Sequence, residues 1–188
     1  TSSCFFCYRF SCQPLLMESR DSDKECEESF NQYKALLDVS ESIVTHRDLA
    51  DLLQKLSQQL PRIVPFNILA LVLYVPETHL MQDHVIQSNV PGDIQGGKTF
   101  AVEAHPAGLV WKTQEPLIIP DLNREARFPE STALMKEDGI QALCVVPLTT
   151  ALRRLGALVF ASQKQGMYDH LGLEFFQQVA RLVAVGVD

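Results

Sequence analysis

The chain has 188 residues, of which 46% are hydrophobic and 21% are charged, as in an ordinary folded domain. Sixteen lysine and arginine residues stand against 23 aspartate and glutamate residues, so the net charge is −7. This acidic balance argues against a nucleic-acid surface, which needs clustered cations. The longest apolar runs, such as residues 68–75, are far shorter than the roughly 20 residues that span a bilayer. Composition therefore predicts one domain of moderate size that neither binds nucleic acid nor enters a membrane.

Residues 1–24 are predicted to be a leader that is poorly ordered or introduced by cloning. Acidic residues are absent before Met17 and frequent after it, so Met17 is a candidate for the natural start. Cys4 and Cys7 have the spacing of half a metal site, but no second pair follows; their role and that of Cys12 stay open. No disulfide framework is visible, which predicts a cytoplasmic location.

Residues 25–188 are predicted to form a single domain that begins with two helices. In the first helix, apolar residues recur at alternating spacings of four and three, as in the seam of a coiled coil; they include Phe30, Tyr33, Leu37 and Val44. A second helix is predicted to follow Thr45, with one apolar stripe from Leu49 to Ile63, and to end at Pro65.

The period of the pattern then changes to that of strands. Residues 66–75 are apolar on both alternating faces, which predicts a strand buried on both sides. Residues 80–88 are more polar and suit an edge strand, and residues 98–102 form a third strand after a turn-rich segment.

Short helices and strands alternate through the second half of the chain. The predicted order is helix 107–113 after Pro106, strand 116–119, a loop, helix 130–138, strand 140–148 and strand 155–162. Short connections between strands require a mostly antiparallel sheet. Three of the strands are apolar on both faces, so helices or a ligand pocket must cover each side. The pattern therefore predicts a three-layer α/β fold.

A long helix capped by Asp169 is predicted to end the chain, with the apolar stripe Leu173, Phe176, Val179, Ala180, Val183 and Val187. The terminal helices could form a parallel homodimer through Phe30, Tyr33, Leu37, Val44, Val183 and Val187. The alternative is that each stripe packs on its own sheet.

The order of elements from about residue 31 to residue 188 resembles a GAF domain, a small-molecule sensing module. The segments that carry the resemblance are His105-Pro-Ala-Gly-Leu-Val-Trp111, Glu115-Pro-Leu-Ile-Ile-Pro-Asp121, Gly139-Ile-Gln-Ala-Leu-Cys-Val-Val-Pro-Leu148, Arg154-Leu-Gly-Ala-Leu-Val-Phe160 and the closing Phe175 to Val187. The final helix is similar to that of sigma-54-dependent regulators of the formate hydrogenlyase activator and NifA-like type. The resemblance implies a six-stranded antiparallel sheet with helices on both faces and a ligand between one helical layer and the sheet.

Candidate binding residues follow from that implied location. The N–H groups of Ala107 and Gly108, at the start of the helix that follows Pro106, could hold an anion together with Arg124 and Arg127. The other candidates by location are Trp111, Asp121, Asn123, Phe128 and Cys144. Structural alternatives stay open, because the arginines can pair with nearby acids, the aromatic rings can pack, and Cys144 can be a small core residue.

No familiar catalytic motif and no set of metal ligands is apparent, which predicts a domain that is not an enzyme and holds no metal. We expect a sensor of a small-molecule effector of unknown identity, in a bacterial sigma-54-dependent activator with a downstream output domain. The alternatives are a GAF module of a sensor histidine kinase or of a cyclic-di-nucleotide enzyme, and a ligand-free dimerisation module. No cofactor can be named from the sequence.

Overall fold

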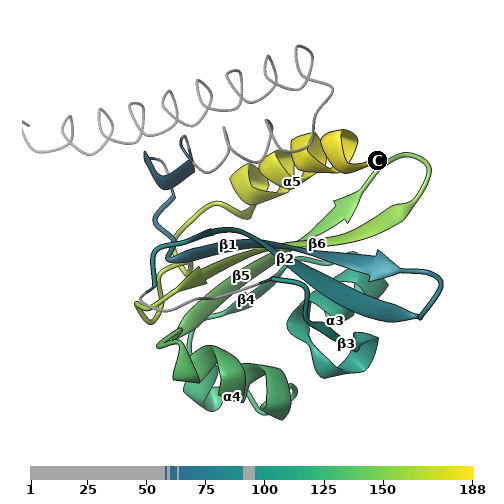
Figure 1. Cartoon of the computed structure of the whole chain (residues 1–188). Coiled ribbons are helices and arrows are strands. Elements are labelled where there is room, and N and C mark those ends of the chain that lie inside the picture. Colours follow the sequence, from purple (N-terminus) through teal and green to yellow (C-terminus); the bar gives the residue numbers. More distant parts are fainter. Residues whose placement is uncertain (1–57, 59, 63, 91–95) are drawn as a thin grey trace, which may run out of the picture.

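The computed structural model describes residues 58, 60–62, 64–90 and 96–188. Its centre is a six-stranded sheet in which all neighbouring strands are antiparallel, in the order β3-β2-β1-β6-β5-β4 (Figure 1). The strands are β1 (Ile68–Val75), β2 (Leu80–Ser88), β3 (Thr99–Ala101), β4 (Leu117–Ile119), β5 (Ala142–Thr149) and β6 (Arg154–Ser162). This sheet confirms the predicted antiparallel α/β fold.

Helices cover both faces of the sheet. The α-helices in the described ranges are α3 (Pro106–Thr113), α4 (Pro129–Glu137) and α5 (Leu173–Val187), and short 3₁₀ turns are η1 (Leu60–Arg62), η2 (Val102–Ala104) and η3 (Leu122–Arg124). The long helix α5 lies on one face, whereas α3 and α4 lie on the other (Figure 1). The predicted three-layer arrangement is therefore present.

Alternation along the strands divides the core into two parts. On β6, Leu158 and Phe160 belong to the core beneath α5, whereas Val159 and Ala161 belong to the core on the side of α3 and α4. Successive side chains of a strand point to opposite faces, so each central strand contributes to both cores. A change at one residue of β6 therefore acts on one face, and a change at its neighbour acts on the other.

The start of the last helix differs from the sequence expectation. Asp169 was expected to cap it, but residues 164–171 form turns and α5 begins after Gly172. The reason is Tyr168, which is fully buried and packs edge-on against Phe176 with ring centroids 5.9 Å apart. Burying this ring requires the chain to turn before the helix begins.

The buried stripe of α5 also differs in its members. Leu173 is exposed and Val187 only partly buried, and the stripe instead includes Phe175 and Ala184. Val183, expected at a dimer interface, is fully buried against its own sheet, which is the alternative that the pattern left open.

Several expectations lie outside the described residues. These are the leader with Cys4, Cys7, Cys12 and Met17, the first helix with its seam residues Phe30, Tyr33, Leu37 and Val44, and most of the second helix.

Candidate ligand cavity

A cavity of about 620 Å³ lies between the sheet and α4. Strands β1, β2, β3, β5 and β6 contribute to its floor, and α4 and the segment just before α3 contribute to its walls. Sites for small molecules and cofactors typically measure roughly 300–1,000 Å³. The cavity is therefore large enough for a small organic ligand.

The cavity exists because α4 is poorly supplied with apolar side chains. Of its nine residues only Thr132 is buried, and the Thr132 hydroxyl donates a hydrogen bond to the Phe128 carbonyl oxygen at 2.8 Å. By contrast, α3 buries Pro106, Ala107, Gly108 and Val110 of its eight residues. A helix with few side chains to insert cannot close on the sheet, so space remains under α4 while α3 packs tightly.

The floor of the cavity is apolar. Ile68, Ala70 and Val72 alternate along β1, and Val159 and Ala161 do so along β6. These are the cavity-side members of strands whose other members pack beneath α5. A ligand on this floor would bury apolar surface, the main source of favourable binding energy for an uncharged organic body.

Asp83 interrupts this apolar floor. It lies on β2 directly opposite Val72 of β1, and among the cavity-lining residues of the strands it alone is charged. Its Oδ1 atom is buried and has no hydrogen-bond partner in the described part of the chain. A buried polar atom without a partner is unfavourable by roughly 1–3 kcal/mol, so a ligand that donated a hydrogen bond to this oxygen would gain binding energy.

His105 forms part of the cavity wall and is held in one orientation. Its Nδ1 accepts a hydrogen bond from the Ala107 N–H at 3.0 Å and so caps α3, and its ring stacks on Phe100 with centroids 4.2 Å apart. Burial lowers the pKa of His105 to about 4, so the ring is neutral at pH 7. Since Nδ1 is the acceptor, the proton of the neutral ring is on Nε2.

The remaining lining residues make a mixed rim. Glu130, Leu134 and Lys98 are exposed, and Asp138 is half-buried. Leu134 is 52% exposed at the mouth, which leaves an apolar side chain next to the entrance.

The candidates at the start of α3 lie close to the cavity but do not line it. Ala107 and Gly108 are buried, and their N–H groups, which were expected to be free, donate to His105 Nδ1 and to the His105 carbonyl oxygen, both at 3.0 Å. Trp111 stacks on Tyr74 with centroids 4.1 Å apart and donates from Nε1 to the Arg154 carbonyl oxygen.

The candidates of the 121–128 segment are engaged locally. Asp121 accepts from the Asn123 N–H at 2.9 Å, and Arg124, whose side chain is 87% exposed, lies 3.6 Å from the Asp121 carboxylate. Arg127 donates to Glu125 at 2.6–2.9 Å, and this hydrogen bonding lowers the pKa of Glu125. Phe128 is buried. None of these five candidates is among the residues that line the cavity.

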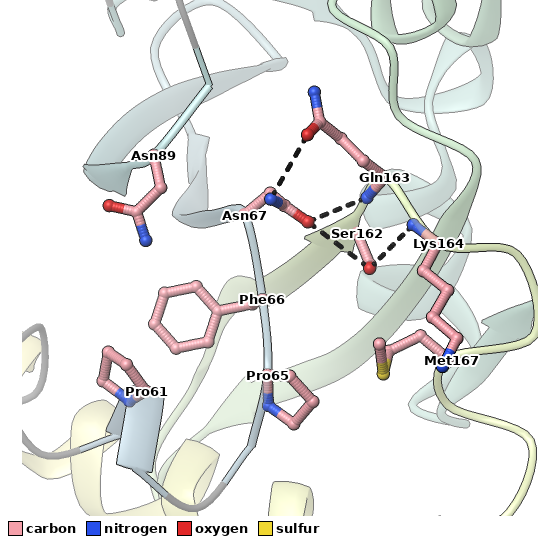
Figure 2. A pocket seen from close by; sticks show the side chains of 9 residues that line it. All are labelled: Pro61, Pro65, Phe66, Asn67, Asn89, Ser162, Gln163, Lys164 and Met167. Atoms are coloured by element: carbon pink, nitrogen blue, oxygen red, sulfur yellow. Dashed lines mark hydrogen bonds between the residues drawn. The ribbon is translucent and has the colours of Figure 1, made fainter.

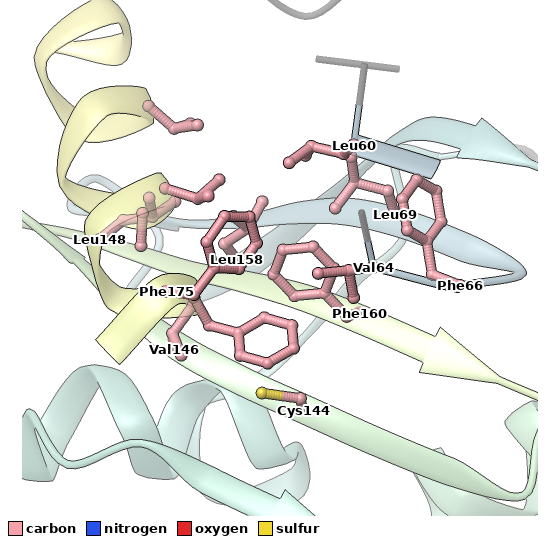
Figure 3. Packing of buried hydrophobic residues seen from close by; sticks show 14 of the residues in the cluster. Leu60, Val64, Phe66, Leu69, Cys144, Val146, Leu148, Leu158, Phe160 and Phe175 are labelled. Carbon is pink, nitrogen blue, oxygen red and sulfur yellow. The ribbon is translucent and has the colours of Figure 1, made fainter. Parts of the chain in front are cut away.

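Cys144 lies on the opposite face of the sheet from the cavity. It is fully buried in the core beneath α5, with Val146 and Phe160 on the same side (Figure 3). Burial raises the pKa of its thiol to about 12, which keeps it protonated and unreactive at neutral pH. It is the only cysteine in the described ranges.

A second hollow of about 510 Å³ lies where β1 begins and β6 ends. Figure 2 shows Asn67 at its centre, with Oδ1 accepting from the Gln163 N–H at 2.9 Å and Nδ2 directed at the Gln163 side chain. Ser162 Oγ accepts from the Lys164 N–H at 3.1 Å. The polar groups of this hollow are hydrogen-bonded to one another and hold the start of β1 against the end of β6. The cavity under α4 is therefore the better ligand site.

Sequence reasoning missed Asp83 and His105 as site residues. A signal for Asp83 was present, since it shares a face of its strand with the apolar residues Met81 and Val85. The signal for His105 was its position directly before Pro106, where a side chain can cap a helix.

The neutral state of His105 predicts a pH-dependent stability. The unfolded chain has the ordinary histidine pKa of 6.5 and the folded chain about 4, so between these values the unfolded state binds a proton that the folded state does not. The contribution of His105 to the free energy of unfolding is therefore fully present above pH 6.5. It is lost as the pH falls through this window, by roughly 2 kcal/mol between about pH 7.5 and pH 5.

The matched variant is His105→Asn, because asparagine keeps an acceptor at the helix cap but does not titrate. Urea unfolding at the two pH values should show that the free energy of unfolding falls less in the variant than in the wild type. Some loss remains in both proteins, because their carboxylates titrate. Equal losses would mean that His105 is not buried in its neutral form.

No group of three or more histidine, cysteine or acidic residues in the described ranges is arranged to hold a metal ion. Within the same ranges, the helices are too short or too polar to cross a bilayer.

Comparisons with known proteins agree with this fold. Residues 48–187 match the sequence profile of the GAF domain. The chain is 24% identical over 177 residues to the formate hydrogenlyase transcriptional activator of Salmonella typhimurium, a match that covers 89% of this chain and 25% of that protein. It is 23% identical over 185 residues to the Escherichia coli activator of the same name, covering 94% and 26%. The chain thus spans about a quarter of the length of these curated relatives.

Solved structures share the architecture at low identity. Free methionine-R-sulfoxide reductase from Neisseria meningitidis superposes with a TM-score of 0.67 at 14% identity, covering 82% of this chain and 87% of that one. The GAF domain of an Acinetobacter phosphoenolpyruvate-protein phosphotransferase gives 0.64 at 14% identity, covering 83% and 92%. The fold therefore occurs both in an enzyme, the reductase, and in one domain of a phosphotransferase. With the sequence profile matched over most of its length and the antiparallel sheet in place, the chain belongs to the GAF domain family.

Proposed function

We propose that this GAF domain is the sensor of a sigma-54-dependent transcriptional activator, in which a small molecule binds in the cavity under α4 and α5 transmits its presence. The observation that carries the proposal is the cavity itself, with its apolar floor and two polar residues in its lining, Asp83 and His105. Such a combination of apolar area and a few fixed polar groups is typical of small-molecule sites. The similarity to transcriptional activators supports the regulatory role.

The strands beneath the cavity offer a route to α5. Leu143 of β5 and Val159 of β6 face the cavity, whereas Cys144 and Phe160, the next residues along, face α5. A ligand that shifts these strands would change the surface on which α5 rests. A ligand can bias such an equilibrium only by binding one packing state better than the other.

The end of α5 is tied to the loop between the same two strands. Thr150 Oγ1 donates to the Asp188 carboxylate at 2.9 Å, and the Arg153 guanidinium donates to the Asp188 carboxylate and to its carbonyl oxygen. A movement of β5 and β6 would therefore reach both the middle and the end of the helix.

We infer binding rather than catalysis at this cavity. The thiol of Cys144 is on the other face of the sheet and is protonated, so it cannot react with a ligand on the cavity floor. His105 is neutral and already engaged at Nδ1, which suits it to donate one fixed hydrogen bond from Nε2.

The test is to fill the cavity. Ala70→Leu places a larger apolar side chain on the floor, and Ala151→Leu makes the same change at an exposed position of the β5–β6 loop. Thermal shift with nucleotides, formate, 2-oxoglutarate, oxyanions and small amines and amides should find a compound that raises the Tm of the wild type and of Ala151→Leu. That compound should raise the Tm of Ala70→Leu by less than a quarter as much, because its site is occupied.

The opposite result would favour an interaction module. If no compound separates wild type from Ala70→Leu, and native mass spectrometry shows a stable dimer, the domain is an interaction module rather than a sensor.

A further inference from the structure

The charges around the cavity give the chemical class of the ligand. Among the lining residues there are three carboxylates, Asp83, Glu130 and Asp138, against one ammonium group, Lys98. The fifth titratable lining residue, His105, is neutral and contributes no positive charge. Glu130 and Lys98 are both exposed and screened by water. The two partly buried carboxylates, Asp83 and Asp138, therefore set the balance, which favours a cation over an anion.

One of these carboxylates, Asp83, is on the cavity floor. Asp83 lies opposite Val72 within the apolar surface, and its Oδ1 is buried without a partner in the described part of the chain. Its main chain is fully used in the sheet edge, where its N–H donates to the Lys98 carbonyl oxygen and its own carbonyl oxygen accepts from the Gly97 N–H. These bonds hold the backbone at Asp83 in place, and the residue is among those that line the cavity.

The groups that could have held an anion are engaged elsewhere. The N–H groups of Ala107 and Gly108 donate to His105, Arg127 pairs with Glu125, and Arg124 does not line the cavity. Lys98 is exposed at the rim, where water screens its charge. None of the donors that the sequence predicted for an anion is therefore offered to a ligand in this cavity, where His105 Nε2 is a buried donor of the wall.

Resting on the sensor function proposed above, we propose that the cavity binds a small organic cation whose protonated nitrogen donates a hydrogen bond to Asp83 and whose apolar body lies on the floor formed by β1 and β6. The apolar body would contact Ile68, Ala70 and Val159, and the protonated nitrogen would give the buried Asp83 Oδ1 a hydrogen-bond donor. A charge-assisted hydrogen bond of this kind is among the strongest that a small ligand can make.

The test uses three probes of the same shape, benzamidine, benzamide and benzoate, which are positive, neutral and negative at pH 7. Binding to the full chain is measured by titration in two-dimensional amide NMR, which also locates the site through the amides of Ala70, Val85 and Gly97. Benzamidine should bind at the cavity at least about tenfold more tightly than benzoate, with benzamide between them.

Asp83→Asn is the decisive variant, because it removes the charge, keeps the shape and leaves the backbone bonds of β2 intact. It should remove most of the difference in affinity between benzamidine and benzoate. Glu130→Gln makes the same chemical change at an exposed rim position, and it should alter that difference by about twofold at most.

The other outcomes separate the two proposals. If benzoate binds at the cavity as tightly as benzamidine, the proposal of a cation is wrong while the sensor cavity stands. If no probe shifts the cavity amides and Ala70→Leu behaves as the wild type, the sensor cavity fails and the cation site fails with it.

Discussion

Replacing Gly108 by alanine is expected to destabilise the domain by about 3 kcal/mol or more, although alanine is the better helix former. Gly108 lies in α3, and a Cβ atom there would stand 1.8 Å from the Val102 carbonyl oxygen and 2.6 Å from its carbonyl carbon. Both contacts are with backbone, so no flexible side chain can move aside. The gain in helix propensity, about 1 kcal/mol, is smaller than this overlap.

The matched control is Gly172→Ala. Gly172 precedes α5 with φ of −63°, and a Cβ atom there meets nothing within 4 Å. We expect this change to cost at most about 1 kcal/mol in urea unfolding, because Gly172 is the N-cap of α5, where alanine is poorer than glycine, but its Cβ meets no clash. Equal effects of the two substitutions would mean that α3 does not approach η2 as closely as the structure has it.

The same contact explains why Gly108 is important to the cavity without lining it. His105 lies between η2 and α3, so the close approach at Gly108 fixes the place of the His105 ring in the cavity wall. The sequence analysis singled out this glycine for a different reason, namely a free N–H group that could hold an anion. The structure gives it a packing role instead, because the Gly108 N–H donates to the His105 carbonyl oxygen.

Strands and their faces could be predicted from the sequence because their pattern is local. Residues 80–88 have the predicted bounds, since turn residues flank an alternating segment. The predicted place of this strand at the sheet edge is wrong, because β3 pairs with its outer side. The start of α5 could not be predicted from Asp169, because the burial of Tyr168 against Phe176 is a contact between segments and leaves no local pattern.

The position of the cavity could be predicted only in part. The resemblance implied a ligand between the sheet and the layer that holds α3 and α4, where the cavity lies, but the candidate residues were in α3, in the 121–128 segment and at Cys144, and none of them lines the cavity. A sequence signal did exist in α4, whose residues 129–137 are mostly polar and bury little. Which helix stands away from the sheet depends on how both pack at once, and that is decided in three dimensions.

Because β6 has a different core on each face, alanine substitutions at two adjacent residues should lower the free energy of unfolding by unequal amounts. Phe160 is fully buried beneath α5 and packs edge-on against Phe66 and Phe176, with ring centroids 6.0 and 4.9 Å apart. Phe160→Ala should cost about 3–5 kcal/mol in urea unfolding, because it empties a close-packed core. Val159→Ala, on the cavity face, should cost only roughly 1 kcal/mol, because part of the Val159 side chain already borders empty space.

For ligand binding the ranking of these two substitutions should be reversed, with Val159→Ala having the larger effect. Val159→Ala widens the cavity floor and should weaken the binding of benzamidine, whereas Phe160→Ala leaves every lining residue in place and should change it little at a temperature where the variant is folded. Equal costs of unfolding for the two variants would show that the cavity face is packed as closely as the face beneath α5. In that case no room for a ligand would exist, since a hollow floor and a close-packed floor cannot respond alike to the loss of a side chain.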